Sequence, residues 1–366
     1  MIDIVCNYAG GNIKTVALEA GRVLLEQDLR DTSGWWFYWN FSAQAAAGQT
    51  VLFQFVNGEV VGPWGPAVSY DGVEWAWLGK NSLRSRDSFI YTFREGQQRV
   101  FFSFCLPYQM HHFERFYSRI ARHRAVSRQI LTVSEQLRAI PYLQIGCSEA
   151  ERHIIFTARH HACESTPSYV LEGVIDYLLQ AERSPLLDRC LVHYIPFMDI
   201  DGVEGGDQGK GRAPHDHNRD YTDTPMYSST AELMAIAADR QFDIALDFHD
   251  PFKWEGRNDV PFFVKQPSPI KEEIERLGGF LQQICSEHQD AAAIRYCSAN
   301  DLESGEDWNI PHGRACSNFF WRHGARLACS LEFPYFGTEE AAVTADNSRR
   351  FGHSLGRALE RYINET

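Results

Sequence analysis

The chain has 366 residues, of which 44% are hydrophobic and 23% are charged, and this balance is typical of a folded globular protein. Its net charge of −13 argues against a nucleic-acid surface, because phosphate binding needs clustered Lys and Arg. No run approaches the roughly 18 apolar residues of a membrane span, and the N-terminus lacks a basic segment followed by an apolar stretch, so we expect neither membrane insertion nor export.

The first part of the chain, residues 21–106, consists of short aromatic and β-branched runs separated by turn signals such as Asn57-Gly58. This pattern predicts an antiparallel β-sandwich domain over residues 1–108. Most of the tryptophans lie in this region, at Trp35, Trp36, Trp39, Trp64, Trp75 and Trp77. Such a group could form a carbohydrate-binding face, but it is more typical of a sandwich core and a domain interface.

After Pro107 the hydrophobic spacing becomes helical, and apolar runs then alternate with helical stretches. This pattern predicts an α/β domain over residues 109–366, with a mixed, largely parallel sheet flanked by helices. The expected strands are 153–158, 190–198, 242–248 and 325–333. A stripe of apolar residues recurs every four positions near the C-terminus and predicts a helix packed on that sheet, at Phe351, Leu355, Leu359 and Ile363.

The nine cysteines form an odd set without a CxxC pair, and several lie in apolar runs. We interpret them as free thiols in a reducing compartment, which predicts a cytoplasmic location.

An imidazole and a carboxylate, His161 and Glu164, follow the 153–158 strand at a spacing that suits two positions of a zinc tetrahedron. The spacing alone is weak, because the chain repeats it at His111 and Glu114 on an amphipathic helix, where a solvated or capping role is expected. His249 ends another predicted strand and could supply a third ligand, since parallel sheets build sites at strand carboxyl ends.

Between these ligands lies a glycine-rich loop, residues 201–221, which contains Asp216, Asn218 and Arg219. An Arg beside an Asn can bind a carboxylate, and Asp216 could accept the free ring N–H of a zinc histidine. The alternative is an exposed polar loop. Glu332 ends an apolar strand, where an ionised carboxylate is unusual, and it suits a general base.

Over residues 140 to 364 the chain resembles the funnelin-type zinc metallocarboxypeptidases. The resemblance lies in the order of four features: H-x-x-E, D-x-N-R, a strand-end His and a strand-end Glu. Preceding runs such as WFYWNFS and GPWGPAVSYDGVEWAWLG resemble the β domain of the cytosolic carboxypeptidase branch. The resemblance implies one zinc per chain, removal of C-terminal residues from peptides or proteins, and a role for each matching residue. In that scheme His161, Glu164 and His249 bind zinc, Glu332 activates the metal-bound water, Asn218 and Arg219 grip the terminal carboxylate, and Asp216 supports the first histidine.

The family's carbonyl-polarising arginine is expected at Arg212, with Lys210 as the alternative, because the family spacing is not kept here. By the family's spacing Ser317 lies at the floor of the specificity pocket, which favours neutral side chains, and His312 could supply a donor. Either Arg314 or Arg322 could turn into the pocket and restore the glutamate preference of the cytosolic branch.

Two other functions stay open at this point. One is an aspartoacylase-type zinc acyl-amino-acid amidohydrolase, which resembles the same catalytic fold but lacks the N-terminal β domain. The other is a catalytically inactive peptidase-like binding protein. The complete set of candidate metal ligands and the candidate general base argue against it. The sequence predicts no oligomeric state.

Overall fold

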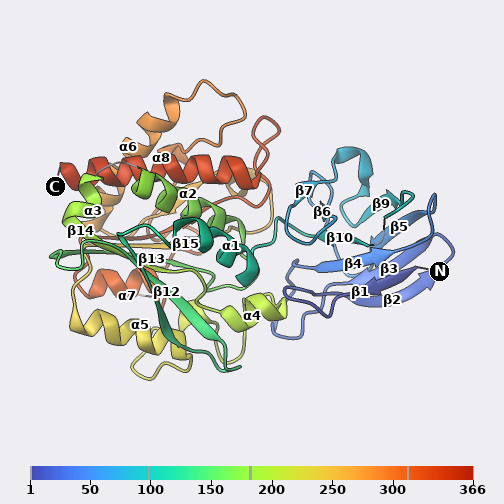
Figure 1. The fold of residues 1–366 in the computed structure, drawn as a ribbon, viewed down its shortest axis with the longest axis horizontal. Coiled ribbons are helices and arrows are strands. Elements are labelled where there is room, and N and C mark those ends of the chain that lie inside the picture. Colours follow the sequence, from blue (N-terminus) through green and yellow to red (C-terminus); the bar gives the residue numbers. More distant parts are fainter. Residues whose placement is uncertain (1, 98, 181–183, 311–312, 366) are drawn as a thin grey trace.

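The computed structural model describes residues 2–97, 99–180, 184–310 and 313–365. Two sheets from the N-terminal part lie at one end of the elongated molecule, and a helix-flanked sheet lies at the other (Figure 1). This arrangement confirms the predicted combination of an N-terminal antiparallel sheet and a mixed α/β fold. None of the helices in the described ranges is long and apolar enough to cross a membrane.

The first sheet is antiparallel throughout, and the second contains one parallel pair, β3 with β5. In order across the first sheet the strands are β1 (Asp3–Val5), β4 (Asn40–Gln44), β10 (Val100–Ser103), β6 (Ala67–Ser69) and β7 (Ala76–Trp77). In the second they are β2 (Lys14–Glu19), β3 (Arg22–Glu26), β5 (Thr50–Phe55), β9 (Ser88–Thr92) and β8 (Leu83–Ser85).

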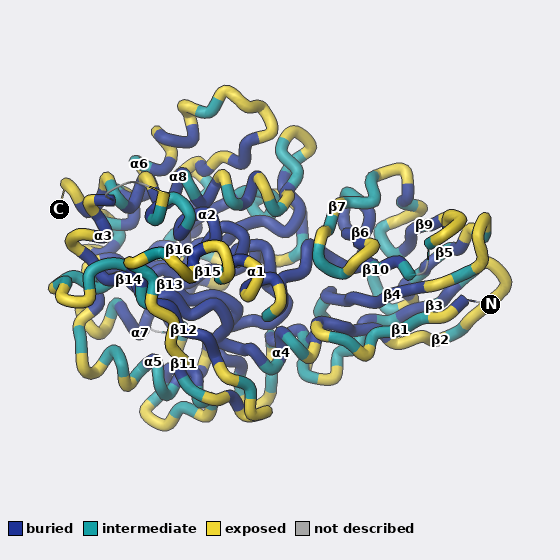
Figure 2. Tube along the Cα trace, in the orientation of Figure 1, coloured by how far each residue is buried: buried dark blue, intermediate teal, exposed yellow. Residues whose placement is uncertain are grey.

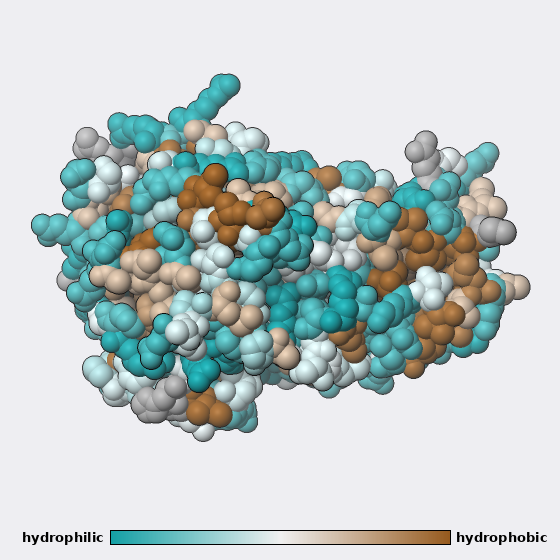
Figure 3. Space-filling model, turned by 90° about the horizontal axis from the view of Figure 1, so that it is seen from below, coloured by the Kyte–Doolittle hydropathy of each residue, from teal (hydrophilic) through white to brown (hydrophobic). Residues whose placement is uncertain are grey.

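Aromatic side chains join these two sheets face to face. Phe53 of β5 lies 5.5 Å from Phe41 of β4 and 5.4 Å from Phe102 of β10, measured between ring centroids. Trp39 is fully buried beside them, whereas the Trp77 indole donates to the backbone of Val343 in the following fold. Trp39 and Trp77 therefore have the core and interface roles that the sequence favoured for the group. On the outer strand β2, Val16 and Leu18 are exposed, and Figure 3 shows hydrophobic patches over this end of the molecule.

The third sheet has seven strands, of which the central four are parallel and the outer three pair antiparallel. Its order is β11 (Val126–Val133), β12 (Ala139–Gly146), β14 (Cys190–Ile195), β13 (Arg152–Ala158), β15 (Ile244–His249), β17 (Leu327–Glu332) and β16 (Phe262–Val264). The four central strands are the apolar runs of the sequence, and they are buried on both faces (Figure 2).

Helices cover both faces of this sheet, with α2, α6 and α8 on one side and α5 and α7 on the other (Figure 1). The C-terminal apolar stripe lies on α8 and is buried, as predicted. The helices are α1 (Met110–Ile120), α2 (Thr166–Gln180), α3 (Pro185–Arg189), α4 (Ile200–Gly205), α5 (Ser228–Asp239), α6 (Ile270–Ser286), α7 (Cys316–Arg322) and α8 (Ala345–Asn364). Short 3-10 turns are η1 (Lys80–Ser82), η2 (His217–Arg219), η3 (Gly256–Asp259) and η4 (Ser298–Asn300).

Candidate metal centre

Three buried side chains face one another at or just past the carboxyl ends of β13 and β15. His161 Nδ1 lies 3.0 Å from one carboxylate oxygen of Glu164, and His249 Nδ1 lies 2.7 Å from the other. Potential ligand atoms of the three residues all lie within 4.8 Å of one another. Two imidazole nitrogens and a carboxylate are a donor set that zinc accepts, with a fourth position left for water or substrate. The side chains of this chain therefore fit a catalytic zinc.

Carboxylates also face the second ring nitrogens of the two histidines. His249 Nε2 lies 2.7 Å from Asp247 Oδ2, and His161 Nε2 lies 3.7 Å from Asp216 Oδ1, an ion-pair distance. The Asp216 Oδ1 atom is buried and has no hydrogen-bond partner among the described residues. Metal-binding histidines commonly donate their other N–H to a carboxylate, which fixes the tautomer and directs the free nitrogen at the metal.

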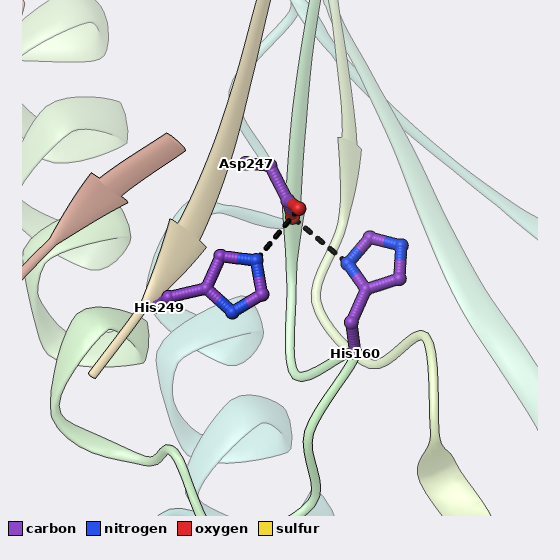
Figure 4. A group of neighbouring side chains, drawn as sticks. All are labelled: His160, Asp247 and His249. Atoms are coloured by element: carbon purple, nitrogen blue, oxygen red, sulfur yellow. Dashed lines mark hydrogen bonds and ion pairs between the residues drawn. The ribbon is translucent and has the colours of Figure 1, made fainter. Parts of the chain in front are cut away.

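Asp247 and His160 belong to this centre, although the sequence analysis did not single them out. The Asp247 carboxylate lies between the rings of His249 and His160, and His160 Nδ1 is 2.8 Å from it (Figure 4). His160 Nε2 in turn lies 2.7 Å from the Tyr221 hydroxyl. A signal was available, since residues two apart in a strand point to the same face, which places Asp247 beside His249.

The repeat of the motif, at His111 and Glu114, is exposed, in line with the solvated role expected for it. It lies on α1, where the neighbouring His112 accepts a hydrogen bond from the backbone N–H of Gln109 and caps the helix. Glu114 pairs with Arg128. His111 itself is exposed and packs against His112, so the repeat takes no part in the centre formed by His161.

Glu332 lies next to the ligands because β17 pairs with β15 in a register that sets it opposite His249. The side chain is buried and lines the same cavity as His161 and His249. Burial, together with the nearby Glu164 carboxylate, raises the pKa of Glu332 to about 7, although His249 and Lys210 act in the opposite direction. A buried carboxylate with a raised pKa is suited to accept a proton near neutral pH.

Lys210 reaches the centre, whereas Arg212 does not. The Lys210 ammonium lies 2.5 Å from Glu164 Oε1 and lines the cavity. The Arg212 guanidinium is held by the carboxylates of Asp199, Asp31 and Asp207 at 2.6, 3.2 and 2.9 Å. A guanidinium surrounded by three carboxylates is fixed in place, and Arg212 is not among the cavity-lining residues. Of the two candidates for the carbonyl-polarising cation, the structure brings only Lys210 to the ligands.

Asn218 and Arg219 border the ligands on another side. The Asn218 amide nitrogen lies 3.2 Å from His249 Nε2, and its oxygen accepts from the backbone N–H of Cys316 at 3.0 Å. Arg219 is exposed and lines the cavity, and within the described ranges its guanidinium donates only to the backbone oxygen of Asn218. An ordered amide beside an accessible guanidinium is suited to bind a carboxylate.

These residues share one cavity of about 680 Å³. Ser317 is buried in its wall and accepts a hydrogen bond of 3.3 Å from Gln266, which also lines it. Arg314 is exposed and outside the lining, and Arg322 donates to the backbone oxygens of Gly313 and Asn318. His312 lies outside the described residues.

Comparison with known proteins identifies the class to which this fold and centre belong. The family model of zinc carboxypeptidases matches residues 115–318, and the chain therefore belongs to that family. Among curated relatives it is similar to cytosolic carboxypeptidase 6 of Caenorhabditis elegans, with 25% identity over 209 residues, covering 50% of this chain and 45% of that protein. It is also similar to cytosolic carboxypeptidase 3 of Mus musculus, with 26% identity over 146 residues, covering 37% of this chain and 14% of that protein.

Two solved structures share the fold over the whole chain. A metallo-carboxypeptidase from Pseudomonas aeruginosa aligns with a TM-score of 0.80 and 19% identity and covers 99% of both chains. One from Burkholderia cenocepacia aligns with a TM-score of 0.81 and 16% identity and covers 100% of both chains. The chain spans less than half the length of the two curated relatives. The family match favours the peptidase interpretation over the aspartoacylase-type alternative.

Proposed function

We propose that this protein is a zinc-dependent carboxypeptidase that hydrolyses the C-terminal peptide bond of peptides or proteins. The observation that carries this proposal is the convergence of three kinds of group on one cavity. The metal-ligand set of His161, Glu164 and His249 lies beside the base candidate Glu332 and the carboxylate-binding candidates, and all of them except the fully buried Glu164 line that cavity. Nucleophile activation and recognition of a chain end are the two requirements of an exopeptidase.

One zinc per chain is proposed at His161, Glu164 and His249. When held there, zinc supplies Lewis acidity that lowers the pKa of water and polarises a carbonyl. The chain's own groups arrange this site: Asp247 and Asp216 face the outer ring nitrogens, so each imidazole presents its Nδ1 to Glu164 and the metal position.

Glu332 is the proposed general base, which accepts a proton from the attacking water and passes it to the leaving amine. Lys210, in preference to Arg212, is the proposed cation for the developing negative charge on the carbonyl oxygen, because its ammonium lies against the ligand Glu164. Asn218 and Arg219 are proposed to bind the terminal carboxylate of the substrate and so to set which bond lies over the ligands.

The pocket for the C-terminal side chain is proposed to select neutral residues. Ser317 and Gln266 contribute neutral polar groups there. Among the described lining residues the cations are Lys210 and Arg219, and both have other proposed roles. The cost of removing water from an acidic side chain must be offset by a fixed positive partner. The described residues around Ser317 and Gln266 do not offer one.

We divide the chain into an N-terminal domain of residues 1–108 and a catalytic domain of residues 109–366. The last strand of the first sheet pair, β10, ends at Ser103, and α1 begins at Met110. A cytoplasmic location is proposed from the free cysteines and from the names of the cytosolic relatives.

One experiment tests both the bound metal and the requirement for a free C-terminal carboxylate. We would measure zinc content, and compare hydrolysis of one peptide with a free carboxylate and the same peptide amidated. We expect about one zinc per chain, loss of zinc in His161→Ala, and hydrolysis of the acid only. Equal cleavage of acid and amide would contradict the role of Asn218 and Arg219 and favour an endopeptidase or amidase.

A further inference from the structure

The N-terminal part of the chain contributes an aromatic side chain to the catalytic cavity. Trp36, just before β4, lines the cavity together with Phe252, three residues after the ligand His249. The two ring centroids lie 6.0 Å apart, and Phe252 is 46% exposed. An exposed aromatic ring in a cavity wall keeps apolar surface available to a ligand.

These rings are held in place from behind. Phe37 is buried and packs against Trp36 and Phe252 at centroid distances of 5.6 and 5.4 Å. The backbone oxygen of Trp36 accepts a hydrogen bond of 2.8 Å from the buried Gln27 side chain. The aromatic pair of Trp36 and Phe252 is therefore preformed, which lowers the entropy cost of binding to it.

A series of contacts gives the position of this pair relative to the chemistry. Asn218 contacts His249 at 3.2 Å, and His249 contacts Glu164 at 2.7 Å. Glu164 contacts Lys210 at 2.5 Å, and the Lys210 ammonium lies 5.0 Å from the centroid of the Trp36 ring. Asn218 and Trp36 thus stand at the two ends of this series of contacts, with the metal ligands and Lys210 between them.

A peptide that follows this series, with its terminal carboxylate at Asn218 and its scissile carbonyl at the metal ligands, continues past Lys210. Its next side chain, that of the penultimate residue, then meets Trp36 and Phe252. We propose that this aromatic pair is a subsite for an aromatic or large aliphatic penultimate residue. The inference rests on the proposed carboxypeptidase function and adds the substrate class: peptides with an apolar residue before a neutral C-terminal one.

The test measures hydrolysis of three peptides by the zinc-loaded protein. All three end in Gln, and the penultimate residue is Phe in the first, Ala in the second and Glu in the third. For the wild type we expect kcat/KM to be about tenfold higher with Phe than with Ala, and lowest with Glu. Trp36→Ala and Phe252→Ala should each reduce the Phe to Ala ratio several-fold, whereas Trp36→Phe should largely retain it. Two independent variants guard against a folding defect in either one.

The neighbouring Trp35 provides a matched control. Its indole donates to the backbone oxygen of Asn57, and it does not line the cavity, so Trp35→Ala should keep the wild-type ratio. A wild type that cleaves the three peptides equally, or prefers Glu, would overturn the subsite while leaving the carboxypeptidase function intact. Release of no residue from any peptide would overturn both. A ratio unchanged in Trp36→Ala and Phe252→Ala would show that the preference arises elsewhere and overturn the assignment.

Discussion

The cavity has two walls that differ in construction. The strand wall, formed by His161, His249 and Glu332 with Glu164 buried behind it, lies at the ends of β13, β15 and β17. Its side chains are buried, and Glu164 contacts both histidines. The loop wall, formed by Arg219, Trp308 and Ile310, is exposed. Strand register fixes distances within the first, whereas exposed loop side chains can adjust to a ligand.

This difference assigns separate tasks to the walls. Groups that move protons or hold a metal need constant geometry, which strands supply. Groups that recognise varied peptides gain from accessible, adjustable side chains. We therefore expect substitutions in the strand wall to reduce the rate of the chemical step, and substitutions in the loop wall to change which peptides are accepted.

The largest effect is expected in the strand wall at Glu332. Glu332→Gln keeps the size and hydrogen-bonding capacity of the side chain but removes the proton acceptor, so kcat should fall by about 10² to 10⁴. Zinc content, measured by elemental analysis, should equal that of the wild type, because Glu332 is not among the proposed ligands. A variant that turns over at the wild-type rate would remove Glu332 from the mechanism.

Lys210 is the next test, because it comes from the loop before Asp216 but contacts the strand wall at Glu164. Lys210→Met should lower kcat/KM by about 10² to 10³, the usual cost of removing a group that stabilises the developing oxyanion. Arg212→Met instead leaves the buried Asp199 without its partner and should lower the free energy of unfolding by about 3 to 5 kcal/mol. Denaturant unfolding and kinetics on both variants separate the roles. Normal stability with lost activity in Arg212→Met would reverse this assignment.

The contrast between the walls also explains what the sequence could predict. The apolar runs at 153–158 and 242–248 predicted β13 and β15. His249 and Glu332 were placed correctly at strand ends because each directly ends an apolar run, and the pairing of β15 with β17 then sets them opposite each other. The choice between Lys210 and Arg212 could not be made from spacing. Gly209 and Gly211 adopt φ of +75° and +62°, a region that L-residues avoid, so the loop turns in a way that the sequence does not specify.

A smaller effect is expected at Asp247, which supports the strand wall from behind. Asp247→Asn leaves a side chain of the same size but takes away the carboxylate that faces His249 Nε2. We expect zinc affinity to fall by about 10- to 100-fold, measured by competition with a chelator. His160→Gln should have a weaker effect, since His160 hydrogen-bonds to Asp247 and meets the ligand His249 only as a ring stacked at 6.0 Å. Unchanged zinc affinity in Asp247→Asn would show that the ring of His249 is oriented without it.

The smallest effect is expected for the side-chain preference at the C-terminus. Ser317 offers one hydroxyl, which already accepts a hydrogen bond from Gln266. Arg314 is exposed outside the cavity lining, and Arg322 is engaged by two backbone oxygens. A glutamate side chain would therefore lose its water without gaining a charged partner there, whereas glutamine loses less on desolvation.

Matched peptides ending in Gln and in Glu, with the same penultimate residue, measure this preference directly. We expect a several-fold higher kcat/KM for the Gln peptide, a ratio set by hydrogen bonding to neutral groups. Arg314→Ala should leave the ratio within about twofold of wild type, because surface substitutions away from a site have small effects. The opposite result, a Glu preference that disappears in Arg314→Ala, would mean that this guanidinium turns into the cavity when substrate binds. Arg314 would then join the loop wall as its specificity residue, since a guanidinium binds a carboxylate more strongly than a serine hydroxyl does.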